Sequence, residues 1–411
     1  MPIENLKANF KFHGVGQGLF YSGCIINKYD EKFNFIYDCG TSSKFDIEDA
    51  VINCFNRPAA DRPIIHCLFI SHFHLDHISG VPYILKYYNV HNVIIPNLSP
   101  EEMALMCINN NIDEASDLYY LITEPIHYFN EYGVDSIFFI DPQDNEIGNN
   151  RQNESYGKEV RDFFVSGKTE PKRDIIDDYY SKSHSNAFKC GSLTLNPYRT
   201  EWIFKIYQDY DKEQQKVIVS FMETAYKKYS DIPLRDDIKN AVSNKDYIND
   251  IKYIYGKVKK DINQSSLTVY HGPAENVYPK RYNIYPFCKH HKCCHKYCCE
   301  NICKGYPATL LTGDINLNTL RNQGNDFEEF IANTPNKIGF FQIPHHGSKY
   351  NTNISLIQKM LPPNIEMFCS YGISNRYHHP NAYMLNKLMM NTYSNIHHIV
   401  QFCSVEYSIN F

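Results

Sequence analysis

Residues 71–77 constrain this chain more than any other segment, because they crowd three histidines and one aspartate into a short turn. They read Ser-His-Phe-His-Leu-Asp-His and follow an apolar run over 64–70 that is typical of a buried strand. The next residues, 78–88, have helical spacing. Imidazole nitrogens and carboxylate oxygens suit zinc and related divalent cations. The segment therefore predicts a metal site at the end of a strand, rather than a polar turn whose histidines bind nothing.

The remainder of the chain alternates strand-like and helix-like segments, which predicts an α/β layered fold. The expected strands are 8–13, 19–28, 33–37, 92–95, 266–270, 308–313, 339–344, 366–371 and two within 397–411. The expected helices are 45–57, 78–88, 99–123, 316–333, 353–360 and 380–391, with an inserted helical pair within 211–260. Residues 142–190 are polar and read as a long loop. The glycines at 14, 16 and 18 predict a β-hairpin turn, because no helix and no Lys-Ser/Thr pair follows them.

The composition narrows the class of protein. The chain has 411 residues, 43% of them hydrophobic and 21% charged, which is ordinary for a globular protein. Its net charge of −5 gives no general support for nucleic-acid binding, so an anionic substrate has to be attracted by metals and local cations. No signal peptide is recognisable and no apolar run reaches the roughly 18–20 residues of a membrane span. We therefore expect a cytoplasmic protein without a membrane partner.

The His-x-His-x-Asp-His pattern resembles the metallo-β-lactamase fold superfamily, and five further motifs follow the same family's order. The likeness is closest to the hydrolase domain of the DNA-uptake protein ComEC and its soluble relatives. It covers roughly residues 8–98 and 265–411. The five motifs are Val-Gly-Gln-Gly at 15–18, Asp-Cys-Gly at 38–40, Leu-Leu-Thr-Gly-Asp at 310–314, Pro-His-His-Gly-Ser at 344–348 and Asn-Arg-Tyr-His-His-Pro at 375–380.

This resemblance implies a four-layer αββα sandwich with the metal site at one edge, between the two sheets. We expect residues 1–411 to form one such domain, with insertions at 99–190 and 200–262 and a Cys/His-rich loop at 288–304. The helical insertion could also dock a protein partner.

The resemblance also assigns roles at the site. His72 and His74 would bind a first divalent cation, and Asp76 and His77 a second. Asp314 would bridge both, and either His345 or His346 would supply the late histidine. Asp38 would orient a ligand imidazole, and Asp76 and His379 would take part in catalysis, with His379 protonating the leaving group or contacting the substrate.

The sequence departs from many two-metal members in one respect. Those proteins carry a further histidine ligand between the first motif and the bridging aspartate. The corresponding strand end here, 193–197, reads Leu-Thr-Leu-Asn-Pro and has no histidine. His184 and His271 are the nearest substitutes along the chain, so occupancy of the first metal position is open.

The expected activity is metal-dependent hydrolysis. Zinc lowers the pKa of bound water toward ~7, and two cations roughly 3.5–4 Å apart can also neutralise charge on substrate oxygens. The ligands suit zinc first, and they are compatible with manganese or iron. The resemblance favours a phosphodiesterase or nuclease acting on nucleic acid or a nucleotide-like substrate. The alternatives are hydrolysis of a lactone, thioester or other carbonyl ester, and a non-catalytic metal-binding module.

A second metal-binding segment is expected in the loop at 288–304. A tetrahedral zinc needs four ligands, and this loop offers more than twice that number. Without a secretion signal, such a cluster indicates a structural zinc before it indicates disulfides. The candidates are Cys288, His290, His291, Cys293, Cys294, His295, Cys298, Cys299 and Cys303. The loop could place lysines near an anionic substrate, or it could be a metal-pinned surface loop without a substrate role.

Overall fold

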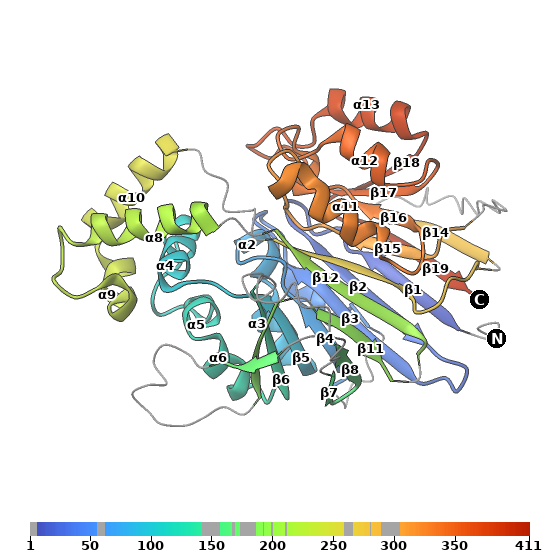
Figure 1. The fold of residues 1–411 in the computed structure, drawn as a ribbon, viewed down its shortest axis with the longest axis horizontal. Coiled ribbons are helices and arrows are strands. Elements are labelled where there is room, and N and C mark those ends of the chain that lie inside the picture. The colour runs from blue at the N-terminus through green and yellow to red at the C-terminus, as the bar shows by residue number, and fades with distance from the viewer. Residues whose placement is uncertain are drawn as a thin grey trace.

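The computed structural model describes residues 6–55, 62–141, 157–166, 169–172, 186–191, 193–198, 200–209, 212–258, 266–279, 281–288 and 305–411. Two large β-sheets pack face to face, and helices cover both outer faces (Figure 1). The predicted four-layer αββα sandwich is therefore confirmed.

The first sheet is built largely from the N-terminal third of the chain. Its strands are β1 (Lys7–Phe12), β2 (Phe20–Ile26), β3 (Lys32–Cys39), β4 (Ile64–Phe69), β5 (Asn89–Pro96), β6 (Ser136–Ile140), β9 (Thr169–Pro171), β10 (Ala187–Cys190), β14 (Arg281–Cys288) and β19 (Cys403–Asn410). Their order is β14-β19-β1-β2-β3-β4-β5-β6-β10-β9. β1 and β2 form the predicted antiparallel hairpin. β3 to β6 pair in parallel, so their C-terminal ends lie along one edge.

The second sheet contains most of the C-terminal strands. They are β7 (Gly157–Val160), β8 (Phe163–Ser166), β11 (Leu193–Pro197), β12 (Trp202–Gln208), β13 (Leu267–Pro273), β15 (Ala308–Leu311), β16 (Ile338–Gln342), β17 (Glu366–Ser370) and β18 (Asn395–Ile399). Their order is β18-β17-β16-β15-β13-β12-β11-β8-β7. β15 to β18 are parallel, which again collects their C-terminal ends at one edge.

The helices form the two outer layers. The first sheet is covered by α1 (Ile47–Ile52), α2 (Leu75–Ile78), α3 (Val81–Tyr87), α4 (Pro100–Asn110), α5 (Asp117–Thr123), α6 (Pro125–Glu131), α8 (Lys212–Tyr226), α9 (Ile238–Ser243) and α10 (Lys245–Val258). The second is covered by α11 (Asn325–Ala332), α12 (Ile354–Met360) and α13 (Ala382–Thr392). Short 3-10 turns are η2 (Leu234–Asp236), η4 (Arg321–Gly324) and η5 (His345–Gly347).

Buried strands of this kind are apolar on both faces, because each face packs on a different layer. In β4, Leu68 packs among the helices, whereas Phe69 faces the second sheet. In β3, Ile36 and Phe35 divide in the same way. These strands therefore read as continuous apolar runs, and the sequence located both of them.

Seven of the described strands were not predicted, and the expected helices over 45–57 and 316–333 are longer than α1 and α11. β6 and β12 lie in the segments expected as insertions, yet each is a strand of a main sheet. β14 was also missed. The expected helix over 316–333 begins only at Asn325, because Asn322 and Gln323 adopt left-handed backbone angles in η4. The polar segment 142–190, expected as a loop, contains β7 to β10 in its described part.

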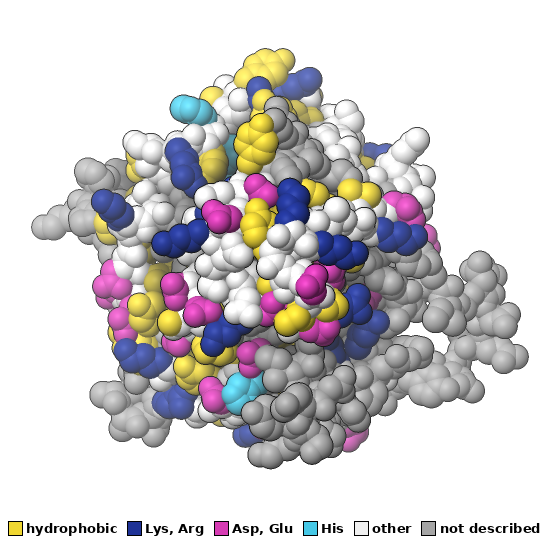
Figure 2. All heavy atoms as spheres, turned by 90° about the vertical axis from the view of Figure 1, so that its left-hand side faces the viewer, with side chains coloured by type: hydrophobic (Ala, Val, Ile, Leu, Met, Phe, Trp, Pro, Cys, Tyr) yellow, Lys and Arg dark blue, Asp and Glu magenta, His cyan; other side chains and the backbone are white. Residues whose placement is uncertain are grey.

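The helices α8, α9 and α10 pack on α4 and extend the outer layer of the first sheet. Figure 2 shows the molecule from this side, and lysine, arginine and acidic side chains are interspersed there rather than separated by sign. Such a face provides no single-sign field for a polyanion. Docking of a protein partner at 200–262 stays a prediction.

Within the described residues, no helix combines the length and the apolar character needed to cross a membrane.

Candidate metal centre

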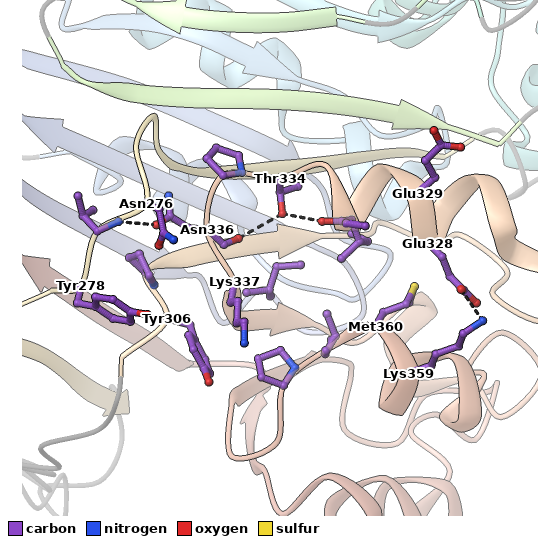
Figure 3. A pocket seen from close by; sticks show the side chains of 18 of the residues that line it. Asn276, Tyr278, Tyr306, Glu328, Glu329, Thr334, Asn336, Lys337, Lys359 and Met360 are labelled. Atoms are coloured by element: carbon purple, nitrogen blue, oxygen red, sulfur yellow. Dashed lines mark hydrogen bonds and ion pairs between the residues drawn. The ribbon is translucent and has the colours of Figure 1, made fainter.

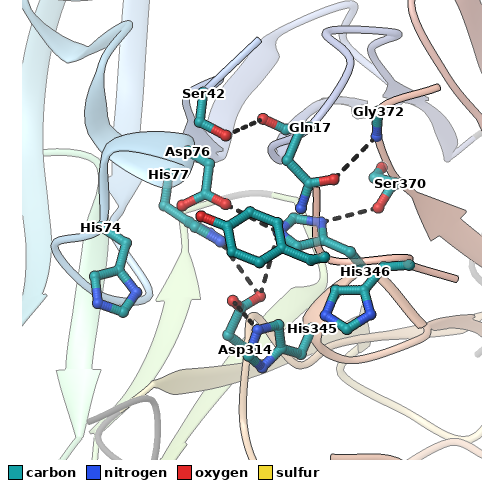
Figure 4. A network of polar contacts seen from close by, with 12 residues as sticks. Gln17, Ser42, His74, Asp76, His77, Asp314, His345, His346, Ser370 and Gly372 are labelled. Atoms are coloured by element: carbon teal, nitrogen blue, oxygen red, sulfur yellow. Dashed lines mark hydrogen bonds and ion pairs between the residues drawn. The ribbon is translucent and has the colours of Figure 1, made fainter. Parts of the chain in front are cut away.

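Segments that are far apart in the sequence meet where the parallel strands of both sheets end. The turn 71–77 follows β4, and Asp38 lies in the last part of β3. Asp314 follows β15, and the pair His345 and His346 follows β16. Figure 4 shows Asp76, His77, Asp314, His345 and His346 grouped around one point.

The turn after β4 is held in place by the hairpin β1–β2 and by the end of β3. The backbone N–H of Leu19 donates to the carbonyl oxygen of Asp76 at 2.9 Å. Gly40 packs directly against the backbone of Asp76 and His77, and a Cβ at Gly40 would clash with the backbone nitrogen of His77. The glycine motifs near residues 18 and 40 therefore position the aspartate and the histidine of the turn.

Asp38 is completely buried and orients the ring of His77. Its Oδ2 lies 2.8 Å from His77 Nδ1 and also accepts a 2.6 Å hydrogen bond from Ser71 Oγ. Its Oδ1 accepts from the backbone N–H of Ser71 at 2.6 Å. The resemblance implied that Asp38 orients a ligand imidazole; the contact with an imidazole is present, and the role in metal binding stays a prediction. The contact leaves His77 Nε2 directed at Asp314.

The carboxylate of Asp314 lies among imidazoles on both of its oxygens. Its Oδ1 is 3.3 Å from His77 Nε2 and 3.9 Å from His346 Nε2. Its Oδ2 is 3.6 Å from His345 Nε2 and 3.9 Å from His72 Nε2. A carboxylate with nitrogen pairs on both sides has the arrangement of a bridge between two cations.

Asp76 and His74 complete the two sides of this cluster. Asp76 Oδ2 lies 3.2 Å from His346 Nε2, on the side of His77. His74 Nδ1 lies 3.1 Å from His72 Nε2, on the other side. The tightest metal-compatible triads among the described residues are His72, His77 and Asp314, and Asp76, His77 and His346.

Both late histidines turn toward Asp314, although neighbouring residues of an extended strand face opposite ways. Their φ angles are 46° for His345 and 53° for His346, so both occupy the left-handed region. The His345 N–H donates to the Gly313 carbonyl at 3.1 Å, and His346 Nδ1 lies 2.9 Å from the Ser370 carbonyl oxygen. The sequence could not decide between the two, and the turn η5 brings both to the site.

The protonation states of the histidines and of Asp314 at this centre suit metal binding. Burial lowers the pKa of His72 and of His74, which keeps their nitrogens free of an extra proton. Burial alone would raise the pKa of Asp314, but His345, His77 and His346 hold it well below its usual range. Burial likewise opposes a charge on His77, yet Asp314 and Asp38 raise its pKa well above the ordinary value. The surroundings therefore favour positive charge at this point.

Two polar atoms at the centre of the cluster provide a test of whether a cation fits. His77 Nε2 and Asp314 Oδ1 are buried and lie 3.3 Å apart, and neither atom accepts or donates a hydrogen bond within the described part of the chain. Unpaired buried polar atoms are costly, and they are commonly explained by an ion or a water. The donor set consists of imidazole nitrogens and carboxylate oxygens, which is the set preferred by zinc. The residues therefore fit a pair of divalent cations.

A loop after β17 forms the rim of the site. The ring of His379 meets that of His345 edge to face, with ring centroids 5.5 Å apart, and Tyr377 stacks on His379 at 6.1 Å. Asn375 Oδ1 accepts from the backbone N–H groups of Tyr377 and His379, which fixes the loop. Arg376 donates to Tyr377 Oη at 2.7 Å. Burial, followed by the neighbouring His345 and His346, lowers the pKa of His379 to about 4.

The remaining candidates lie elsewhere or cannot be placed. His271 is in the interior between the two sheets, where its Nε2 lies 2.9 Å from Tyr21 Oη. It therefore cannot replace the absent histidine. His184 and the Cys/His-rich segment from 289 to 304 lie outside the described residues, and so does the side chain of Cys288.

Three serines at the site were not recognised from the sequence. Ser71 links Asp38 to the turn, and Ser370 provides the carbonyl that holds His346. Ser266 Oγ accepts from the backbone N–H of Asp314 at 3.3 Å and lies 3.2 Å from His72 Nδ1. Ser71 could have been found from its place beside the motif, whereas Ser266 precedes a strand without any local signal.

A pocket lies at the opposite ends of β15 and β16 (Figure 3). Its wall includes Asn336, whose Oδ1 accepts from the backbone N–H of Val277 at 3.0 Å, and the ion pair between Lys359 and Glu328 at 2.5 Å. It contains none of the metal-ligand candidates. This pocket is therefore separate from the candidate metal centre.

Residues 24–106 match the family model described as Metallo-beta-lactamase superfamily, and this segment includes Asp38 and the turn 71–77. This match supports a metal-dependent hydrolase. No curated protein sequence matches the chain. The likeness to ComEC stays a prediction.

Two solved structures are similar in part. One is a long form RNase Z from yeast, at 11% identity and a TM-score of 0.33 over 98% of this chain and 41% of that protein. The other is a metallo-β-lactamase from Cronobacter sakazakii carrying substitutions in its HARLDQ motif, at 13% identity and a TM-score of 0.22 over 60% and 92%. The chain thus spans about two fifths of the length of the yeast RNase Z.

Proposed function

We propose that this protein is a phosphodiesterase that uses two divalent cations, zinc in the first place, to hydrolyse nucleic acid or a nucleotide-like substrate. The observation that carries the proposal is the position of Asp314, with imidazole nitrogens of His72 and His345 near one oxygen and those of His77 and His346 near the other. When bound, the cations provide a hydroxide nucleophile near neutral pH and stabilise charge on the substrate oxygens.

The residues of the chain have distinct tasks in this proposal. Asp314, with imidazoles near both of its oxygens, would help to hold the cations, and Asp38 keeps His77 in the tautomer whose Nε2 is available. Asp76 places a carboxylate beside His346. In the reaction, water adds to phosphorus, the bond from phosphorus to the leaving oxygen breaks, and that oxygen gains a proton.

A phosphodiester is favoured over a carbonyl ester by the rim of the site. Arg376 is exposed there and is oriented by Tyr377, whose ring stacks on His379. A guanidinium matches the geometry of a phosphate, and an aromatic ring can stack on a base. His379, beside His345, lies where its ring can contact the substrate.

The test is hydrolysis of bis(4-nitrophenyl) phosphate by the metal-loaded protein. We expect turnover that a chelator abolishes and that Asp314→Ala reduces by at least a hundredfold, with Glu329→Ala, which removes an exposed carboxylate on α11, as the control. Turnover of a lactone or thioester without phosphodiesterase activity would move the substrate class to carbonyl esters. A protein that binds two metals and hydrolyses none of these esters would be a non-catalytic metal-binding module.

A further inference from the structure

The predicted ligand set requires one late histidine, either His345 or His346. The structure brings both imidazoles to Asp314. We infer that His345 and His346 ligate different cations, and that His345 takes the place of the histidine that is absent between the first motif and Asp314. This inference rests on the proposed metal centre and specifies how its first position is completed.

The distances around Asp314 divide the two histidines between its oxygens. His345 Nε2 lies 3.6 Å from Oδ2, the oxygen that also faces His72. His346 Nε2 lies 3.2 Å from Asp76 Oδ2 and 3.9 Å from Asp314 Oδ1, on the side of His77. Two ligand atoms of a tetrahedral zinc, each ~2.1 Å from the ion, are about 3.4 Å apart. The separation between His345 and Asp314 is therefore that of two ligands sharing one ion.

His345 stands at the solvent side of this arrangement. Its side chain is 24% exposed, whereas that of His346 is 3% exposed and belongs to one of the two tight triads. His77 is common to both triads, and His345 approaches the one with His72 through Oδ2 of Asp314. It can therefore complete a position that the buried residues leave open toward solvent.

The backbone of the turn supports a role for both rings. Two successive non-glycine residues with left-handed φ angles are costly, and such conformations gather at ligand-binding sites. Hydrogen bonds to the carbonyls of Gly313 and Ser370 hold His345 and His346 in this conformation. An extended backbone would direct only one of the two rings at Asp314.

The fold excludes His271 from the first cation position. His271 lies between the sheets and contacts Tyr21. On the described part of the chain, His345 is the histidine that reaches the Oδ2 side of Asp314 together with His72.

The experiment counts zinc per chain by elemental analysis after equilibrium dialysis at fixed free zinc, for the full chain and its variants. We expect His345→Ala and His346→Ala each to lose one zinc relative to wild type, and His379→Ala, the neighbouring imidazole, to lose none. Zinc bound at the Cys/His-rich segment contributes equally to all variants. A difference in zinc count between a variant and wild type therefore measures binding at the candidate metal centre. Removal of even an indirect partner weakens metal binding ~10–100-fold, so loss of a ligand should exceed that range.

A second variant separates ligation from a structural role. His345→Asp restores a ligating oxygen and should recover the lost zinc, with circular dichroism confirming that each variant is folded. An unchanged zinc count in His345→Ala overturns the inference, and so does a count that His345→Asp fails to restore. Asp314→Ala tests the centre itself: if it loses no zinc, the proposed function fails, whereas loss in Asp314→Ala without loss in His345→Ala refutes only the role of His345.

Discussion

His77 and Asp38 form a fully buried pair, with Nδ1 and Oδ2 2.8 Å apart, between the first sheet and the turn that follows it. The two residues are separated by a strand, a loop and a helix in the sequence, and the parallel pairing of β3 with β4 brings them together. Because one ring nitrogen of His77 is used by Asp38, the other is directed at Asp314. The pair thus connects the packing of the sheet to the geometry of the metal centre.

Replacing this carboxylate should weaken the centre without removing a ligand. We expect Asp38→Asn to reduce zinc affinity ~10–100-fold, because His77 loses a charged partner that fixes its orientation. Competition with a chromophoric chelator measures the affinity. Asp30→Asn is the matched control, since Asp30 is exposed and has a positive φ of 60°, close to the 52° of Asp38. Equal affinities in the two variants would contradict the role of Asp38.

Arg376 should contribute to substrate binding more than to the chemical step. It lies at the rim, and a hydrogen bond to a charged group is worth about 1.5–3 kcal/mol, which is roughly 10–100-fold in binding. We expect Arg376→Gln to raise KM for a dinucleotide phosphodiester by that factor with little change in kcat. Lys387→Gln, an exposed cation on α13, is the control for loss of charge. A fall in kcat at constant KM would refute this assignment.

His271 should make the fold sensitive to acid. Burial lowers the pKa of His271 to about 3, from an ordinary histidine value of about 6.5. Between these two values the unfolded chain binds a proton that the folded chain does not. Stability is therefore lost as the pH falls through this window, by about 2 kcal/mol between pH 7 and pH 5. Urea unfolding at the two pH values should show a correspondingly smaller loss in His271→Gln. The same substitution at exposed His127 is the control, and an identical pH dependence in wild type and His271→Gln would contradict the prediction.

The helices α8 to α10 should behave as part of the core rather than as a loosely attached arm. Tyr247 is fully buried against Tyr226 and Met222, whereas Tyr253 on the same helix is 65% exposed. We expect Tyr247→Ala to destabilise the fold by ~3–5 kcal/mol, the usual cost of removing a buried aromatic ring. Tyr253→Ala should change stability by less than ~0.5 kcal/mol. Thermal unfolding and limited proteolysis distinguish the two, and similar effects of both substitutions would mean that the helices do not pack as described.

The strands that are apolar on both faces could be located from the sequence, because burial on two sides removes polar residues from a whole run. β3, β4 and β16 are examples. β6 was missed although it is buried throughout, since five residues within a segment interpreted as an insertion give too short a signal. β12 alternates buried and half-buried residues beside a polar region, and only its pairing with β13 identifies it as a central strand.

For the site, the sequence by itself determined the types of candidate ligand and their local order: His72, His74, Asp76 and His77 in one turn, and Asp314 and the late histidines after later strands. Only the tertiary structure decided that both His345 and His346 face Asp314, that His271 is enclosed in the core, and that Ser266 contacts the centre. The physical reason is that ligand chemistry belongs to single side chains, whereas direction depends on backbone angles and on which strands pair. Those are settled by packing between residues that are distant along the chain.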